Sequence, residues 1–174
     1  MGLENNSISV LFHWGTEVLV ITTITLVVLL GTVLFLQILM PEWPAKTIWM
    51  KYLLMAIVLC TVVIGSACAP IRLKANDDKI TIRLLLGSRE IPLNEVTEVR
   101  KISKSDISGS IRTFGSGGLF GYLGRFKNNR LGSYTMYATE LNNLLLVSTH
   151  NKKYVISCTK SQDFVEYINS QLRE

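Results

Sequence analysis

Charge is absent from two long stretches of this chain. Val18 to Pro41 contains no Asp, Glu, Lys, Arg or His, and neither does Tyr52 to Ile71. As helices rising about 1.5 Å per residue, these stretches would reach about 36 and 30 Å, which matches the hydrocarbon thickness of a bilayer. We therefore predict two transmembrane helices, over about 18–41 and 52–71. Ion pathways and substrate sites in membranes usually need an ionisable residue, so a transporter or channel is not expected.

Cysteine and histidine are too scarce for a disulfide framework or a metal centre. Cys60 and Cys68 would lie about 12 Å apart along one helix, too far to bridge, and Cys158 follows much later. We expect all three cysteines to be buried as small apolar residues. The only two histidines, His13 and His150, are far apart in the chain and offer no paired metal ligands.

Catalytic signatures are also missing. The chain contains neither a Gly-x-Ser-x-Gly nucleophile elbow nor a His-Glu-x-x-His motif. We predict no catalytic residue, no metal, no cofactor and no enzymatic activity. An unrecognised active site remains the third and weakest hypothesis, which a cavity with converging polar groups would revive.

The charges that are present collect in the C-terminal part. After Ile71 there are 16 Lys or Arg against 10 Asp or Glu, a net charge of about +6. A basic domain tied to a membrane most simply faces anionic headgroups, so the lipid bilayer is the first partner expected. No nucleic-acid recognition motif accompanies the charge, and no nucleic acid is expected as a partner.

The distribution of Lys and Arg predicts the orientation. Residues 1–17 carry no Lys or Arg, and the connection between the spans carries Lys46 and Lys51. The segment after the second span is richer, with Arg72, Lys74, Lys79, Arg83 and Arg89. The positive-inside rule then places the C-terminal domain in the cytoplasm. We predict a multi-pass protein of the inner (cytoplasmic) membrane, with the N-terminus also inside.

The resulting division is an N-terminal segment with two spans over residues 1–71 and a cytoplasmic domain over residues 72–174. A short outside turn would lie at Pro41 to Pro44. Trp43 and Trp49 fit an aromatic belt at that surface, and Trp14 fits one at the other surface.

An alternative export signal overlaps the second span. Met50 to Cys68 resembles a bacterial lipoprotein signal: a basic start, an apolar run, then small residues before a cysteine. Translation from Met50 would then lipidate Cys68 and export the domain. Gly65 stands where a larger aliphatic residue is usual, and a complete apolar run precedes Met50, so the two-span interpretation is preferred.

Small and hydroxylated residues interrupt the apolar runs. Gly31, Gly65, Ser66, Ala67 and Ala69 are small enough to allow close helix approach, which suggests a membrane anchor with an oligomer contact. Four threonines, Thr22, Thr23, Thr25 and Thr61, are expected to return their hydroxyl hydrogen bonds to the helix backbone.

The remainder of the chain alternates in twos, as strands do. Ile80, Ile82, Leu84 and Leu86 would share one face of a first strand, followed by a turn at Gly87. Further strands are predicted at 90–93, 97–103, 110–114, 122–127, 134–139, 144–148 and 153–158, with a glycine-rich break after Phe114. Thr159 and Gln162 resemble a capping box before an amphipathic C-terminal helix. The predicted fold is a two-helix transmembrane hairpin followed by an all-β sandwich or barrel of about seven antiparallel strands, with one helix plugging an open end.

The segment from Arg112 to Phe126, RTFGSGGLFGYLGRF, resembles the glycine-rich centre of a bacterial pleckstrin-homology-like (bacterial PH) domain family. The strands at 132–139 and 154–157 and the helix containing Phe164 also resemble that family, so the resemblance covers roughly 79–172. It implies a PH-like sandwich, often joined to a pair of membrane spans, and no particular activity. Inositol-phosphate binding does not carry over, because it belongs to eukaryotic relatives with a different basic loop.

The glycine-rich segment has two interpretations. Its glycines could simply permit the positive φ angles of tight bends. Alternatively, exposed backbone amides with nearby cations could form an anion or headgroup site. The candidate binding residues are Arg112, Gly115, Gly117, Gly118, Phe120, Gly121, Arg125, Lys127 and Arg130.

Two functions therefore compete. The first is a membrane-anchored, non-enzymatic interaction module that binds a protein partner or forms a homo-oligomer at the cytoplasmic face. The second is a sensor for anionic lipid or a small ligand, using the glycine-rich segment and its arginines.

Overall fold

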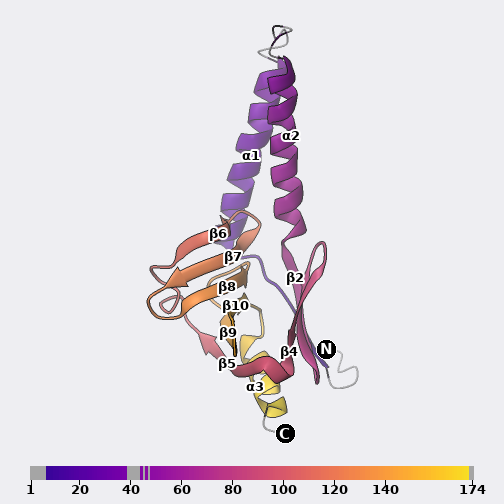
Figure 1. The fold of residues 1–174 in the computed structure, drawn as a ribbon. Helices are drawn as coiled ribbons and strands as arrows, with labels where there is room; N and C mark the ends of the chain where they lie inside the picture. The colour runs from indigo at the N-terminus through magenta and orange to yellow at the C-terminus, as the bar shows by residue number, and fades with distance from the viewer. Residues whose placement is uncertain (1–6, 39–43, 45, 47, 173–174) are drawn as a thin grey trace.

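The structure is a computed structural model that describes residues 7–38, 44, 46 and 48–172. Two long helices, α1 (Thr16–Ile38) and α2 (Ile48–Ala67), stand side by side on top of a sheet-rich domain (Figure 1). Both helices begin a few residues earlier than the sequence predicts, and α2 also ends earlier. The chain leaves α2 at Ala67 and enters a strand at Pro70, so 70–71 belong to the sheet. Of the predicted outside turn, residues 41–43 lie outside the described part.

The helices are not packed inside the protein. Their mean hydropathies are 2.7 and 2.1, yet only 11% and 6% of the residues in their most apolar windows are buried. A core helix of a soluble protein would be mostly buried. Exposed apolar surface of this extent is typical of a surface that contacts a membrane or another protein. By length and composition, both helices can cross a membrane.

The first sheet has four antiparallel strands in the order β1-β2-β3-β4: β1 (Ser7–Leu11), β2 (Pro70–Asn76), β3 (Lys79–Leu84) and β4 (Ser88–Pro92). Strand β1 precedes the helices and pairs with β2, which follows them, so that Val10 lies opposite Leu73. The first sheet therefore takes strands from both sides of the helical pair. No strand was predicted for residues 7–11.

The second sheet has six strands in the order β5-β9-β10-β8-β7-β6. After a single turn of 3-10 helix (Leu93–Glu95), its strands are β5 (Val96–Ile102), β6 (Ile111–Gly118), β7 (Gly121–Asn128), β8 (Gly132–Ala138), β9 (Leu144–Thr149) and β10 (Lys153–Ser157). All neighbouring pairs are antiparallel except β8 and β10, which are parallel. The strand nearest the helices is β6, and the others follow away from them (Figure 1).

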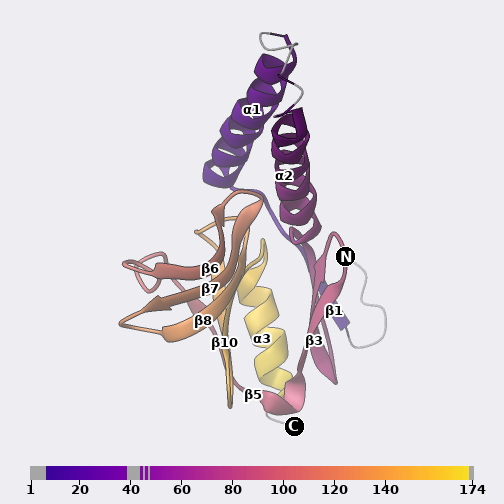
Figure 2. The same cartoon turned by 45° about the horizontal axis from the view of Figure 1, so that its top comes forward.

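Helix α3 (Ser161–Gln171) ends the described chain and lies between the two sheets (Figure 2). Phe164 and Ile168 are fully buried in the main core, which both sheets line. A second cluster covers the other face of the six-stranded sheet, where Phe126 and Tyr134 stack with ring centroids 6.0 Å apart. Strand β9 has apolar residues in succession because it contributes to both clusters.

The predicted class of fold is confirmed: two long apolar helices precede a PH-like domain with two sheets that do not close and a C-terminal helix. Four details differ. The described residues form ten strands instead of about seven. Strands β8 and β10 pair in parallel, whereas only antiparallel pairs were predicted. The glycine run is part of strand β6 and not a break. Thr159 does not cap α3, because its hydroxyl donates to the carbonyl of Leu11, and no side chain caps this helix.

Candidate functional site at the junction of the domain and the helices

The turn between β6 and β7 is docked against α1. The Thr22 hydroxyl donates to the Gly118 carbonyl over 3.3 Å and accepts the amide N–H of Phe120 over 3.0 Å. Thr22 is 7% exposed, so these bonds lie away from solvent. As predicted, the Thr61 hydroxyl donates to a carbonyl of its own helix. The Thr22 hydroxyl instead bonds to the β6–β7 turn of the domain.

The same turn contacts α2 through Phe120. A Cβ added at Gly65 would lie 2.7 Å from Cδ2 of Phe120, so only glycine leaves room for the ring. On the α1 side, a Cβ at Gly118 would lie 2.7 Å from Cδ1 of Ile21. Phe120 is also the only non-glycine residue with a positive φ, 57°, in the described part. The turn thus fits between both helices at two positions where a side chain would collide.

The linker before α1 is fixed to the domain by backbone bonds. The amide N–H of Phe12 donates to the Ile71 carbonyl over 3.1 Å, and that of Gly15 donates to the Thr139 carbonyl over 2.8 Å. The Thr139 hydroxyl in turn donates to the His13 carbonyl over 2.7 Å. Helix α1 is therefore held by a bonded segment and not by a free tether.

An ion pair adds a contact at the start of α1. Lys104 Nζ lies 2.9 Å from Glu17 Oε1, and the Tyr122 hydroxyl donates to Glu17 Oε2 over 3.4 Å. The hydrogen bond and charge of Glu17 raise the pKa of Lys104. Burial, followed by the Glu17 charge, raises the pKa of Tyr122. Both members of the ion pair are more than half exposed, so it contributes little stability.

The tip of the β3–β4 hairpin is docked against the end of α2. The amide N–H groups of Leu85 and Leu86 donate to the carbonyls of Ala69 and Ala67 over 2.9 and 3.0 Å. Leu86 is 70% exposed, so the expectation that it shares a buried strand face is wrong. The bond to Ala67 satisfies a carbonyl that the end of α2 leaves free.

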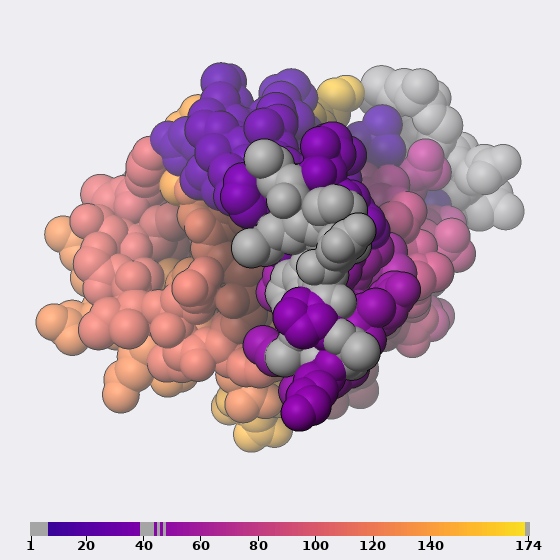
Figure 3. Space-filling view, turned by 90° about the horizontal axis from the view of Figure 1, so that it is seen from above, coloured from indigo at the N-terminus to yellow at the C-terminus, as the bar shows by residue number. Residues whose placement is uncertain are grey.

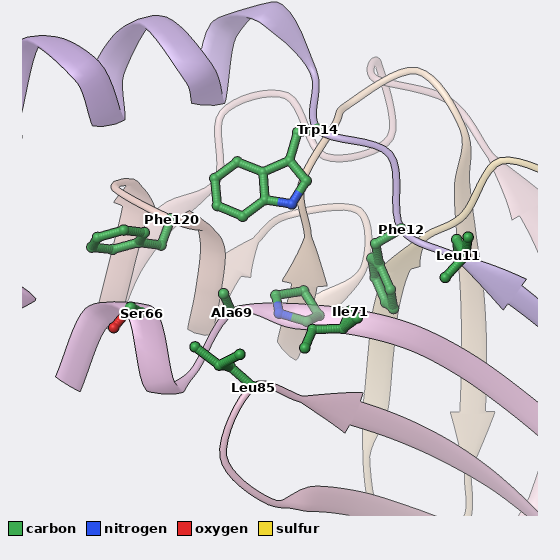
Figure 4. A pocket seen from close by; sticks show the side chains of 9 residues that line it. Leu11, Phe12, Trp14, Ser66, Ala69, Ile71, Leu85 and Phe120 are labelled. Atoms are coloured by element: carbon green, nitrogen blue, oxygen red, sulfur yellow. The ribbon is translucent and has the colours of Figure 1, made fainter. Parts of the chain in front are cut away.

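A cavity of about 360 Å³ lies between these docked segments (Figure 4). Its walls come from the linker before α1, the end of α2, the start of β2, the tip of the β3–β4 hairpin and Phe120. The Trp14 indole lies across the cavity from Leu85 (Figure 4). No charged residue lines it.

The predicted binding residues do not converge on one point. Gly118, Phe120 and Gly121 form the docked turn, where the Phe120 amide is already bonded to Thr22. Gly115 has a φ of 107° and faces Gly124 on the neighbouring strand, where a Cβ would collide with the Leu123 carbonyl oxygen. Close backbone approach and positive φ angles thus explain why several of these positions are glycine. The anion site remains a prediction.

Three of the four predicted cations, Arg112, Arg125 and Lys127, divide between two faces of the six-stranded sheet. The Arg112 guanidinium lies over Gly117, on the face that carries Tyr122 and Phe126. Since side chains alternate along a strand, Arg125 and Lys127 lie on the opposite face.

Arg130 is held elsewhere, in the turn after β7. It donates to the Ser105 carbonyl over 3.1 Å and lies 3.8 Å from the Asp106 carboxylate. The Ser103 amide and hydroxyl lower the pKa of Asp106. Arg130 therefore orders the loop after β5 and does not join the other cations.

Strand β6 is an open edge of the six-stranded sheet. It pairs only with β7, and its register places Phe114 beside Arg125 and Ile111 beside Lys127 on one face. Ile111 and Phe114 are 72% and 74% exposed. Viewed along the helices, the β6–β7 region extends to one side beyond them (Figure 3). An apolar and cationic strip is therefore exposed along the open edge of the sheet.

No metal site is found among the described residues, because no group of three His, Cys, Asp or Glu side chains there could hold an ion. A second, smaller cavity of about 230 Å³ lies beside Tyr122 and Tyr134. Cys158 is buried as expected, but Cys60 and Cys68 are exposed, so that expectation is wrong for the two cysteines near the end of α2. Burial raises the pKa of the Cys158 thiol to about 12, which makes it unreactive at neutral pH.

The residues of the helices that hold the domain were not identified from the sequence as a site. Thr22 and Gly65 were noted only as polar or small residues within the predicted spans. A polar residue inside an apolar run is the signal that could have identified Thr22, because its hydroxyl needs a partner.

Comparison with known families agrees with this architecture. The family model described as "Bacterial PH domain" matches residues 71–172. The chain belongs to this bacterial PH domain family. Comparison with curated proteins and with solved structures gives no match. The match begins after the helices, so strand β1, which completes the first sheet, lies outside it.

Proposed function

We propose that this chain is a membrane-anchored, non-catalytic interaction module of the inner (cytoplasmic) membrane. The two helices cross the bilayer as a hairpin, and the PH-like domain lies on the cytoplasmic side. The exposed apolar faces of both helices support the anchor. The excess of Lys and Arg after the second helix supports the orientation. The lipoprotein alternative would remove β1 and α1, and with them the Val10–Leu73 pairing and the Thr22 bonds.

The open edge of β6 carries the interaction proposal. An unpaired strand edge presents backbone groups to an extended partner, and native proteins usually protect such edges with charge or proline. Strand β4, one of the two edges of the other sheet, carries Arg89, Glu90 and Pro92. Strand β6 has a single charged residue, Arg112, and a bulge between Arg112 and Phe114, yet it exposes Ile111 and Phe114. We propose that an extended segment of a protein partner, or of a second copy, adds to β6 close to the membrane.

A photoreactive phenylalanine analogue at position 114 tests this proposal in native membranes with the full chain. The control position is Leu172, which is also exposed but lies at the other end of the domain, after α3. Illumination should give a protein adduct from position 114 and none from position 172. An added mass of one chain would identify a homo-oligomer. The absence of a protein adduct from position 114, or equal adducts from both positions, would refute strand addition.

The cationic strip favours one second candidate, contact with anionic lipid. Arg125 and Lys127 lie on the same exposed face as Phe114 and Ile111, and cations beside apolar groups are typical of membrane-surface contacts. In this case the analogue at position 114 gives lipid adducts. Arg125→Ala with Lys127→Ala should reduce the co-purified anionic lipid more than Lys101→Ala with Lys152→Ala does. Equal losses would indicate only diffuse charge.

A further inference from the structure

We propose that the cavity at the junction holds the upper part of an acyl chain from a bilayer phospholipid. This inference rests on the proposed membrane anchor, but it does not depend on what binds β6. The volume of about 360 Å³ lies within the range of ligand cavities in proteins. An apolar cavity of this size is not filled well by water, because water needs polar partners.

Several polar groups around the cavity are already satisfied by the protein itself. The Ser66 hydroxyl donates to the Val63 carbonyl over 3.0 Å, and the Ala67 and Ala69 carbonyls accept the N–H groups of Leu86 and Leu85. The Ile71 carbonyl accepts from Phe12. Apart from the indole N–H of Trp14, the walls therefore offer apolar contact and no binding partner for a phosphate or another anion, so the occupant is mainly apolar.

The position of the cavity identifies the source of that occupant. Ser66 belongs to the last turn of α2, and Trp14 lies two residues before α1 begins. The cavity thus lies at the level where both apolar helices enter the domain, which is the boundary of the bilayer. Phospholipid is the most abundant apolar molecule at such a boundary.

An apolar surface connects the cavity with its surroundings. Leu11, Ile71 and Leu85 line it and are 53%, 42% and 54% exposed. Phe120 contributes to the wall while it is held between the two helices. A chain that leaves the bilayer beside the helices can therefore enter the cavity without crossing a polar surface. Trp14 covers the cavity with an indole, a group that favours the membrane interface (Figure 4).

Quenching of Trp14 fluorescence by brominated phospholipid tests the proposal. Trp43→Phe with Trp49→Phe leaves Trp14 as the only tryptophan of the full chain. The protein is reconstituted in phosphatidylcholine vesicles whose chains carry bromine close to the carbonyl group. Ala69→Phe and, separately, Ser66→Leu are designed to fill the cavity. Leu86→Phe adds an apolar group on the same hairpin tip, outside the cavity lining.

The proposal predicts strong quenching of Trp14, a reduction of at least twofold in each filling variant, and no change in Leu86→Phe. Quenching that both filling variants leave intact would overturn it, because bromine would then reach Trp14 from outside the cavity. Absence of quenching in the parent protein would also overturn it. Resistance to carbonate extraction is measured in parallel. Extraction would refute the membrane anchor itself, whereas an inserted protein with unaltered quenching refutes only the lipid in the cavity.

Discussion

The ring of Phe120 occupies space that a side chain at position 65 would need: a Cβ at Gly65 would lie 2.9 Å from Cε2 and 2.7 Å from Cδ2 of that ring. Gly65 belongs to α2, whereas Phe120 belongs to the turn between β6 and β7. The glycine-rich segment therefore has a clear structural role, which is to bring a domain hairpin against both helices.

Gly65→Ala should destabilise the protein by about 1–3 kcal/mol, the usual cost of overpacking a buried contact. The buried ring of Phe120 would have to move, although alanine favours the helix itself. Gly31→Ala is the matched control, since nothing lies within 4 Å of its added Cβ. Thermal denaturation in a mild detergent measures both variants. Equal midpoints would show that Phe120 does not pack against α2.

Thr22→Val should cost about 1–3 kcal/mol, because it leaves the buried N–H of Phe120 without an acceptor while preserving the shape of the side chain. Thr32→Val is the control: the Thr32 hydroxyl only returns to the Val28 carbonyl of the same helix. Limited proteolysis at the β6–β7 turn should accelerate in the first variant alone. Similar rates would argue that Thr22 does not hold the turn.

Val10→Ala should lower the free energy of unfolding of the domain by about 1–3 kcal/mol, as expected for removing buried methyl groups. Val10 is 4% exposed, contributes to the main core and pairs with Leu73. Ser9→Ala, at an exposed position of the same strand, should change stability by less than about 0.5 kcal/mol. Denaturation of the full chain distinguishes them, and equal stabilities would mean that β1 is not part of the folded domain.

Cys158 should resist alkylation until the protein unfolds. Burial raises its pKa to about 12, so near pH 8 the folded thiol stays neutral, whereas an unfolded thiol ionises near pH 8.5. For the same reason, Cys158 destabilises the folded state as the pH rises from about 9 towards 12. A variant that retains only Cys68, which is exposed, should react readily. Mass spectrometry of iodoacetamide adducts tests this, and rapid labelling of native Cys158 would contradict its burial.

Much of the fold could be predicted because its signals are local. The uncharged runs predict both helices, and alternation predicts most strands from Lys79 onward. Strand β1 could not be predicted in this way. Its five residues form a strand because β2 pairs with them, and β2 follows only after both helices. The predicted division after Ile71 does not reflect this pairing.

The site was harder to predict because its residues come together only in three dimensions. The cations from Arg112 to Arg130 are close in sequence. Because side chains alternate along strands and Arg130 lies in the turn after β7, they are found on different faces of the domain. Conversely, Thr22, Gly65 and Phe120 are distant in sequence and meet at one contact. The apolar lining of the cavity likewise comes from several segments, so no single sequence motif could predict the cavity.

Sided labelling of single cysteines tests the helical hairpin most directly. In a chain whose three native cysteines are replaced by alanine, Lys46→Cys introduces a thiol at an exposed position between the two helices, and Lys101→Cys introduces one on the domain. In spheroplasts, a membrane-impermeant maleimide should label position 46 at once and position 101 only after the membrane is permeabilised. Labelling of both positions before permeabilisation, or protection of position 46 together with labelling of position 101, would contradict the account.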